Sequence, residues 1–256
     1  MERKNKVEVI NDLLGYEGLK IIQRPDIFNF SLDSTILADF VTINSSTKEI
    51  IDLGCGNGYI PIFLTLRTNA HITGIEIQEE IYDLAKRSVK LNNLNNQISI
   101  INDNMKNTPA LFSKTKVDVI TCNPPYFPYT EESKINLSDY QTIARHEVLI
   151  TLDEVLQVVN STLKDGGIFA MVHRSERLMD ILESFRKHKI EPKRIRFVYP
   201  KTNSTTSLAV LVEGIKSNKK GGLKILPPLY VNNEDGSYTE EILKIFNYKK
   251  GEQYVK

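Results

Sequence analysis

The chain has 256 residues, of which 41% are hydrophobic and 25% charged, and its formal net charge is +1. These values are typical of a globular protein, and the length predicts one large α/β domain, with or without a small appendage, around a sizeable core. No apolar run approaches the roughly 20 residues that a membrane-spanning helix needs, and the first residues lack the apolar stretch of a signal peptide. We therefore expect a cytoplasmic protein that does not bind a membrane.

The two cysteines, Cys55 and Cys122, stand alone in the sequence. Neither belongs to a CxxC pair or has the spacing of metal ligands. Reduced thiols, as found in a cytosol, are the simplest interpretation. We expect no metal site, and we expect no nucleophilic role for Cys55.

The N-terminal part of the chain precedes the main pattern of strands and helices. Residues 7–30 contain short extended or helical pieces separated by glycines, which indicates an N-terminal hairpin or cap. Ser31 or Asp33 can then cap a helix that ends near residues 44–46.

From residue 47 onwards apolar strands alternate with helices, which predicts a mostly parallel sheet covered on both faces. The expected strands are 49–54, 71–76, 98–101, 117–122 and 168–172. The expected helices are 59–67, 79–92, 152–163 and 176–188. We expect the third of these helices to close at Lys164–Gly167, with glycine past its end.

Two further strands, 194–199 and 207–212, follow each other with no helix between them. We expect them to pair as an antiparallel hairpin at the edge of the sheet, which gives seven strands in all. The last segment contains Pro227-Pro228 and one candidate helix near residues 239–246, and it is expected to pack on the same domain as a tail. The predicted division is a cap and first helix at 1–46, a main domain at 47–213 and a tail at 214–256.

Alternate glycines occupy the turn after the first of these strands, in the sequence DLGCGNG from Asp52 to Gly58. Such glycines let the backbone adopt positive φ and approach a ligand closely, and in a doubly wound sheet this turn is the expected ligand crevice. A dinucleotide fingerprint would place the third glycine one position later. The spacing DxGxGxG fits S-adenosylmethionine, because Glu76 at the end of the next strand can accept hydrogen bonds from both ribose hydroxyls.

We therefore predict that S-adenosylmethionine binds at this turn. Asp103 ends the third strand, where it can accept from the adenine amino group, and Ile77 and Met105 are either apolar walls of the site or core residues. Asp33 and Ser34 are candidates for the methionine end of the cofactor, although helix capping explains them equally well. The predicted cofactor-binding residues are Asp52, Gly54, Gly56, Asn57, Gly58, Glu76, Ile77, Asp103 and Asn123.

A second motif, NPPY from Asn123 to Tyr126, follows the strand at 117–122. Two prolines fix the backbone at a φ of about −65° and remove two amide donors, so the local carbonyls are held rigidly and can accept hydrogen bonds from a ligand. With the Asn123 amide before them and the Tyr126 ring after them, they can trap a flat group that carries an NH2. A proline-rich turn is the alternative interpretation. We predict Asn123, Pro124 and Tyr126 as catalytic residues.

Charge is unevenly distributed along the chain. Residues 173–224 contain 13 Lys and Arg against 5 Asp and Glu. A basic region on an otherwise acidic protein indicates a polyanionic partner, and a solvated face is the alternative. The candidate RNA-binding residues are Arg174, Arg177, Arg194, Arg196, Lys216, Lys219, Lys220 and Lys224.

The glycine turn followed by NPPY resembles the class I methyltransferases that methylate exocyclic or amide nitrogens. More narrowly, the chain is similar to the tRNA1(Val) adenine-N6-methyltransferase family in the segments 30–34, 144–147, 214–228 and 238–243. The resemblance covers nearly the whole chain and implies a Rossmann-like fold. It also implies methyl transfer from S-adenosylmethionine to N6 of an adenine in the anticodon-loop region of a tRNA. His146 is a further candidate for the target pocket, or else a structural residue.

Other functions fit the same motifs. The trap also accepts a glutamine side-chain amide, so a release-factor glutamine N5-methyltransferase is the main rival, although that family carries a longer helical domain before the glycine motif. An rRNA guanine-N2 methyltransferase stays open, whereas a DNA adenine methyltransferase would need a larger target-recognition domain than the tail. A cofactor-free RNA-binding module is the non-enzyme alternative, and the intact Asp52, Glu76 and Asn123 count against it. The sequence leaves the oligomeric state open.

Overall fold

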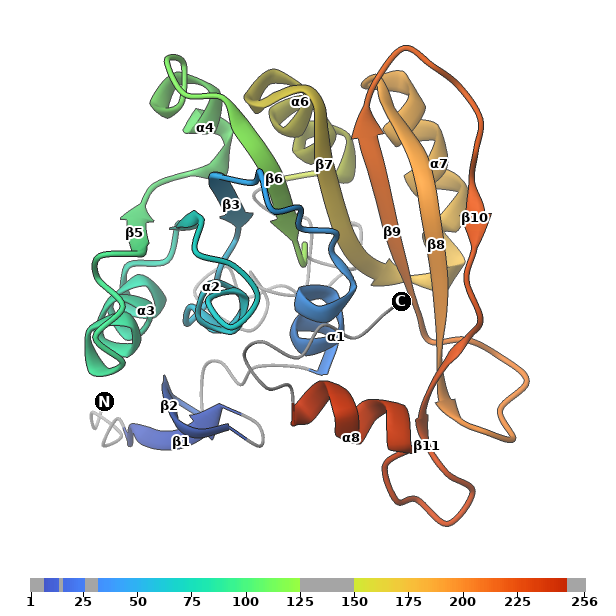
Figure 1. Cartoon of the computed structure of the whole chain (residues 1–256), viewed down its shortest axis with the longest axis horizontal. Helices are drawn as coiled ribbons and strands as arrows, with labels where there is room; N and C mark the ends of the chain where they lie inside the picture. Colours follow the sequence, from blue (N-terminus) through green and yellow to red (C-terminus); the bar gives the residue numbers. More distant parts are fainter. Residues whose placement is uncertain (1–6, 14–15, 26–31, 125–149, 248–256) are drawn as a thin grey trace, which may run out of the picture.

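The chain folds into a central sheet with helices on both faces (Figure 1). The computed structural model describes residues 7–13, 16–25, 32–124 and 150–247. A separate hairpin precedes the sheet and confirms the hairpin expected near the N-terminus. Its antiparallel strands are β1 (Val9–Leu13) and β2 (Tyr16–Gln23).

Five parallel strands form the centre of the sheet in the order β5-β4-β3-β6-β7. They are β3 (Glu49–Leu53), β4 (His71–Glu76), β5 (Ile98–Asn102), β6 (Val117–Cys122) and β7 (Leu163–Arg174). Successive residues alternate between the faces, so Ile50 packs in one hydrophobic cluster and Ile51 in the other. We call the edge at which these five strands end the carboxyl edge, and the opposite edge the amino edge.

The antiparallel hairpin that follows β7 is confirmed, and with it the seven predicted strands. Its strands are β8 (Ile190–Lys201) and β9 (Ala209–Lys216), and β9 lies between β7 and β8. The hairpin is not the edge of the sheet, because β10 (Lys224–Ile225) and β11 (Leu229–Asn232) pair in parallel with β8. These two strands are too short to show an alternating pattern, which is why the sequence did not predict them.

Helices cover both faces of the sheet. One face carries α1 (Leu32–Phe40), α2 (Tyr59–Leu64), α3 (Glu79–Leu91) and α8 (Glu240–Phe246). The other carries α4 (Thr108–Leu111), α6 (Leu152–Thr162) and α7 (Leu178–Lys187), with the 3-10 turns η1 (Met105–Asn107) and η2 (Ser175–Arg177) before α4 and α7. Within the described ranges, every helix is too short or too polar to cross a bilayer.

The end of α6 differs from the prediction. The helix begins with a capping box, in which the Thr151 hydroxyl accepts from the Glu154 amide and the Glu154 carboxylate accepts from the Thr151 amide. It ends at Thr162, before the glycines, since Leu163 already pairs with β6 as the first residue of β7. Gly166 has a φ of 76° and lies where the register of β6 and β7 shifts, so the glycines accommodate a bulge instead of capping the helix.

The tail lies along the same sheet. It adds β10 and β11 to β8, and α8 packs beside α1. Strand β9 crosses the expected boundary between residues 213 and 214. The division of the chain into three segments stays a prediction.

Candidate active site

The loop between β3 and α2 holds the three motif glycines in left-handed backbone conformations. Their φ angles are 70° at Gly54, 55° at Gly56 and 87° at Gly58. A residue with a Cβ is strained in this conformation, which explains the spacing of the motif. The Gly54 and Cys55 amides both donate to the Ile75 carbonyl, at 2.9 and 3.0 Å, and these hydrogen bonds fix the loop against the end of β4.

Asp52, the acidic residue at the start of the motif, is 1% exposed. Thr121 on β6 donates its hydroxyl to Asp52 Oδ1 at 2.7 Å, whereas Oδ2 has no hydrogen-bond partner within the part of the chain that the structure describes. Burial raises the pKa of Asp52 to about 7; the Thr121 hydrogen bond opposes this shift, and the negative charge of Glu76 adds to it. A buried acceptor without a donor costs about 1–3 kcal/mol. The site therefore fits a ligand that brings a positively charged N–H to this oxygen.

Glu76, at the end of β4, joins the glycine loop to the neighbouring strand. Its Oε2 accepts from the Gly56 amide at 3.1 Å, and its Oε1 accepts from the Gln78 amide at 2.8 Å. Burial raises the pKa of Glu76, and the backbone hydrogen bonds oppose that shift. A carboxylate can accept about four hydrogen bonds, so Glu76 can still accept from the hydroxyls of a ligand.

Asn57 connects the glycine loop to the N-terminal hairpin. Its Nδ2 donates to the Ile22 carbonyl of β2 at 3.3 Å. Its Oδ1 is buried and, among the described residues, has no hydrogen-bond partner. Asp52 and Asn57 thus each leave one buried oxygen near the glycines to which no described residue donates.

Asp103 and its neighbours close the site on the side of β5. The Asp103 amide donates to the Glu76 carbonyl at 3.2 Å, and its carboxylate accepts from the Asn104 amide at 2.7 Å and from the Asn107 side chain at 2.8 Å. A Cβ on Gly54 would lie 3.3 Å from Met105 Cε, which places this methionine against the loop. The structure therefore brings the predicted cofactor residues of β3, β4 and β5 together at one end of the sheet.

The NPPY motif begins directly after β6, next to the strand that carries Asp52. The Asn123 side-chain amide donates to the Ser34 hydroxyl of α1 at 3.3 Å. Pro124 is buried. Tyr126 and His146 lie outside the described residues, so their predicted roles stay predictions. Strand β6 pairs with β3, and Cys122 lies opposite the last residue of β3. Asn123 follows Cys122 and therefore lies beside the start of the glycine loop.

Two residues of this site lie outside the roles predicted from the sequence. Thr121 was not singled out, although it bonds to Asp52, because a threonine inside a buried strand carries no motif. Ser34 was considered only as a cap or as a cofactor ligand, whereas the structure shows its hydroxyl on Asn123. Strand pairing gave the only available signal for Thr121, since it lies directly opposite Asp52 in the register of β3 and β6.

The eight candidate RNA-binding residues do not form one surface. Arg174 and Arg177 lie at the carboxyl edge, at the end of β7 and in η2. Lys219 and Lys220 are exposed and lie beyond β9 at the amino edge, and Lys224 is exposed on β10 beside Arg194. The residues at these two edges cannot contact the same nucleotide.

The other three candidates contact the protein itself. Arg194 bonds to the Thr42 hydroxyl and the Phe40 carbonyl and pairs with Glu213 at 3.2 Å. Arg196 donates to the Pro227 carbonyl at 3.0 Å and to the Glu241 carboxylate at 2.7 Å. Lys216 donates to the carbonyls of Asn160 and Leu163 at the end of α6, at 2.6 and 2.7 Å.

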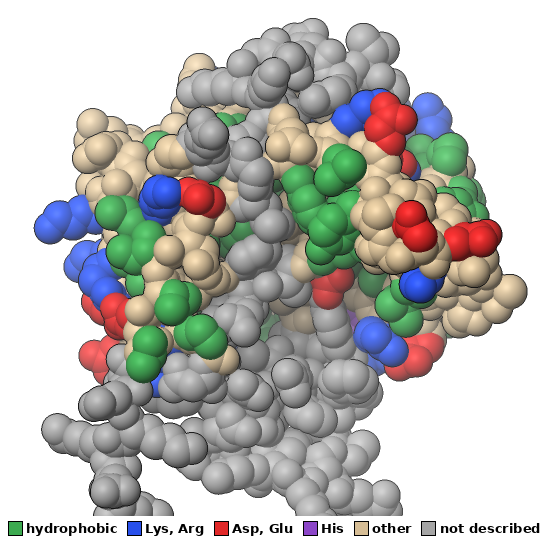
Figure 2. All heavy atoms as spheres, turned by 90° about the horizontal axis from the view of Figure 1, so that it is seen from below, with side chains coloured by type: hydrophobic (Ala, Val, Ile, Leu, Met, Phe, Trp, Pro, Cys, Tyr) green, Lys and Arg blue, Asp and Glu red, His purple; other side chains and the backbone are tan. Residues whose placement is uncertain are grey.

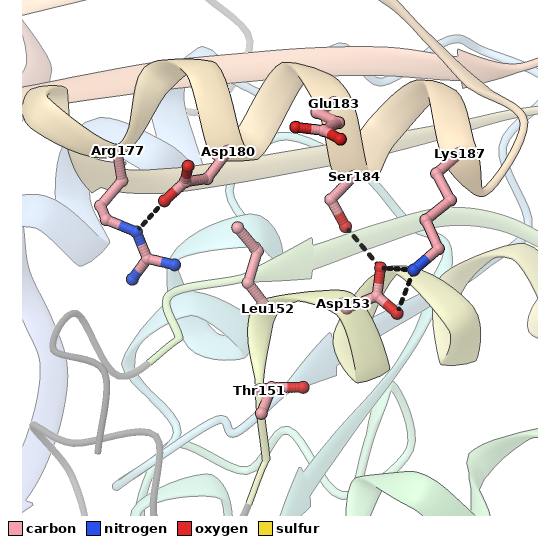
Figure 3. A pocket seen from close by; sticks show the side chains of 8 residues that line it. All are labelled: Thr151, Leu152, Asp153, Arg177, Asp180, Glu183, Ser184 and Lys187. Atoms are coloured by element: carbon pink, nitrogen blue, oxygen red, sulfur yellow. Dashed lines mark hydrogen bonds and ion pairs between the residues drawn. The ribbon is translucent and has the colours of Figure 1, made fainter. Parts of the chain in front are cut away.

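A cleft of about 250 Å³ lies between the start of α6 and α7 (Figure 3). Side chains of both charges line it: Arg177, at the N-terminus of α7, pairs with Asp180 of that helix at 2.6 Å, and Lys187 pairs with Asp153 of α6 at 2.9 Å. Glu183 also lines the cleft. On the face seen in Figure 2, Lys and Arg side chains are interspersed with Asp and Glu in the same way. The described residues contain no cluster of three or more His, Cys, Asp or Glu that could hold a metal ion.

Comparison with known sequences agrees with this geometry. A family profile described as a methyltransferase domain matches residues 44–225. The tRNA1(Val) (adenine(37)-N6)-methyltransferase of Cytophaga hutchinsonii is 23% identical over 92% of this chain and 96% of its own length, and that of Flavobacterium psychrophilum is 24% identical over 77% and 84%. A protein of Methanocaldococcus jannaschii, named as a candidate protein N5-glutamine methyltransferase, is 28% identical over 64% of this chain and 80% of its own length.

Solved structures share the fold. A predicted O-methyltransferase from Agrobacterium tumefaciens superposes with a TM-score of 0.66 at 18% identity, over 84% of this chain and 96% of that chain. The geranyl diphosphate C-methyltransferase of Streptomyces coelicolor, solved with S-adenosyl-L-homocysteine, superposes with a TM-score of 0.53 at 15% identity, over 72% and 76%. These likenesses confirm the Rossmann-like fold that was predicted. Since the family profile matches most of the chain, from β3 to β10 with the glycine loop and the end of β6, the chain belongs to the methyltransferase-domain family.

Proposed function

We propose that the protein transfers a methyl group from S-adenosylmethionine to the N6 amino group of an adenine in tRNA, in the cytoplasm. The observation that carries the proposal is the position of Asn123 and Pro124 directly beside the glycine loop, at the end of the strand next to β3. An acceptor for an amine hydrogen and a site for a methyl donor therefore occupy the same end of the sheet.

The residues around the loop fit S-adenosylmethionine. Asp52 Oδ2, to which no residue in the described ranges donates, suits the ammonium group of its amino acid part, and the lone pairs left on Glu76 suit the ribose hydroxyls. Asp103 and Ile77, at the ends of the next strands, would hold the adenine, and Ile77 is exposed enough to contact it. When bound, this cofactor supplies an electrophilic methyl group on a sulfonium.

Asn123, Pro124 and Tyr126 hold and orient the target amine in this proposal. The adenine N6 lone pair is delocalised into the ring, so the nitrogen is a poor nucleophile. The Asn123 side-chain oxygen and the Pro124 carbonyl can accept its two hydrogens, which biases the nitrogen toward tetrahedral geometry and stabilises the positive charge that develops on it. Tyr126 is expected to stack on the base, and a base extruded from a stacked loop would recover part of the cost of extrusion in this way.

Two relatives support adenine in tRNA as the target, because their names carry this activity and their similarity extends over most of the chain. The relative named for glutamine methylation supports a second candidate, since a glutamine amide presents the same NH2 group to the trap. Its match covers a smaller share of the chain. We therefore place adenine N6 first and the glutamine side chain of a protein second.

The proposal is tested by incubating the protein with labelled S-adenosylmethionine and, separately, total tRNA, total rRNA and a protein fraction. Mass analysis of the labelled product should give N6-methyladenosine from tRNA. Methylated glutamine from the protein fraction, or N2-methylguanosine from rRNA, would contradict it. The variant Asn123→Ala should keep its affinity for the cofactor and lose several orders of magnitude in turnover; collapse of cofactor affinity with high residual turnover would refute the role given to Asn123.

A further inference from the structure

Exposed lysines at the amino edge are not part of the site described above. We call residues 217–224 the lysine loop; they follow the end of β9 and include Lys224, the first residue of β10. Lys219, Lys220 and Lys224 are all exposed in it. The segment 214–225 contains four lysines and no acidic residue.

The lysine loop is held against the start of β8. The Ser217 amide donates to the Lys189 carbonyl at 3.1 Å, the Gly221 amide donates to the Glu191 carboxylate at 2.8 Å, and Lys193 Nζ donates to the Gly221 carbonyl at 2.5 Å. Glu191 is only 4% exposed, so its charge is not displayed on the surface beside the lysines. These contacts give the lysines a defined platform, to which the turn before β8 adds the exposed Lys189.

The lysine loop lies far from the candidate active site. Lys216, the residue before it, pairs with Ile190 at the start of β8, whereas Cys122, the residue before Asn123, lies level with Val212 of β9 in the register through β7. Five residues along the strands at about 3.3 Å each, and two strand spacings of about 4.8 Å, make a separation of roughly 20 Å between Lys216 and Asn123. Lys219 and Lys220, which follow Lys216 beyond the end of β9, therefore lie well away from Asn123, and only a ligand of comparable length can contact both.

We propose that the lysine loop is a second RNA-contact surface, which binds the phosphate backbone of a tRNA away from the nucleotide that is methylated. This inference rests on the proposed function and extends it to how the rest of the substrate is held. Lysine ammonium groups bind phosphates as point charges, without reading sequence. A folded RNA that extends more than roughly 20 Å from its target base reaches the lysine loop with that base at the carboxyl edge, and a stem-loop of only a few base pairs does not.

The test compares full-length tRNA with a short stem-loop that carries the same target adenine. In the double variant Lys219→Ala/Lys220→Ala, we expect the Kd and KM for full-length tRNA to rise about tenfold at moderate salt. The slope of log Kd against log salt should become shallower by about 1.5, since each phosphate contact contributes about 0.7–0.9. The kcat on full-length tRNA and both constants for the stem-loop should stay unchanged.

A matched control removes the same charge elsewhere. Lys86 and Lys90 are exposed on α3, and Lys86→Ala/Lys90→Ala should leave both substrates unaffected. Equal losses on tRNA and stem-loop, no loss on either, or the same loss in the control would each overturn the lysine loop as an RNA-contact surface. A wild-type protein that methylates no tRNA would instead contradict the proposed function, so the two failures are distinguished by the wild-type reaction alone.

Discussion

The Asn123 side-chain amide donates to the Ser34 hydroxyl at 3.3 Å, between the end of β6 and the first helix. An amide has a donor end and an acceptor end, so a partner for its NH2 group fixes which way its oxygen points. The proposed reaction needs the Asn123 oxygen to face the target amine. Ser34 is 8% exposed, and we infer that it is a positioning residue for Asn123.

The variant Ser34→Ala tests this role. Loss of one hydrogen bond of about 1–1.5 kcal/mol should lower kcat about tenfold, because the amide can then rotate away from the productive orientation. The affinity for S-adenosylmethionine should stay unchanged in titration calorimetry, and Ser34→Thr, which keeps the hydroxyl, should recover most of kcat. A fall in cofactor affinity that matches the fall in kcat/KM would show instead that Ser34 binds the cofactor.

The buried Asp52 should destabilise the free protein at neutral and alkaline pH. Its pKa of about 7 lies above the roughly 3.9 of an unfolded chain, so between these values the folded state holds a proton that the unfolded state has released. Stability from this group therefore falls as pH rises from about 4 to 7. The variant Asp52→Asn should melt at a higher temperature than wild type at pH 8, and the difference should shrink toward pH 4. A pH-independent difference in thermal unfolding would argue against the raised pKa.

The same residue should make cofactor binding depend on pH. An ammonium group favours the ionised carboxylate, so binding to a partly protonated Asp52 must release a proton. Affinity for S-adenosylmethionine should rise as pH increases from 6 to 8 in wild type, and it should be weaker and flatter in Asp52→Asn. Calorimetry in buffers of different ionisation enthalpy counts the released protons. The control is Asp165→Asn, which changes an exposed carboxylate. An equally weak pH dependence of cofactor affinity in that variant would show that Asp52 does not cause it.

The fold and the positions of the glycine loop, Asp52 and Glu76 could be predicted because short segments determine them. Alternating strands and helices fix the order of a parallel sheet, and Asp52 and Glu76 sit at strand ends whose positions follow from that order. The glycines of the motif indicate positions with positive φ angles, which few other residues tolerate. Local patterns therefore sufficed to place the candidate residues at the ends of their strands.

The rest depends on contacts between residues far apart in the sequence. Ser34 and Asn123 are 89 positions apart, and no periodicity links them. Counting charges grouped Arg194 with Lys220, but the arginine pairs with Glu213 inside the fold and the lysine is exposed at the amino edge. A count of basic residues cannot tell a paired charge from one available to a ligand.

Substitution of Gly54 should separate backbone strain from loss of the site. Gly54 and Gly166 have similar φ angles, 70° and 76°, so alanine at either position should cost about 1–2 kcal/mol of stability. A Cβ at Gly166 would meet nothing within 4 Å. A Cβ at Gly54, which lies in the glycine loop, would be 3.3 Å from Met105 Cε. Chemical denaturation should show similar destabilisation in both variants, and only Gly54→Ala should lose cofactor binding. Loss of cofactor binding in both variants would show that it follows from lower stability in general and not from a change at the glycine loop.

Arg194 should matter for stability more than for RNA binding. Its guanidinium lies 4.4 Å from the centre of the Phe40 ring and pairs at 3.2 Å with Glu213, which is 4% exposed. Removing the arginine leaves a buried carboxylate with its cation gone, so Arg194→Ala should lower the free energy of unfolding by about 3 kcal/mol. Its folded fraction should bind tRNA as wild type does, whereas Lys220→Ala should bind more weakly with unchanged stability. Arg194→Ala with full stability and weaker tRNA binding would make Arg194 an RNA contact after all.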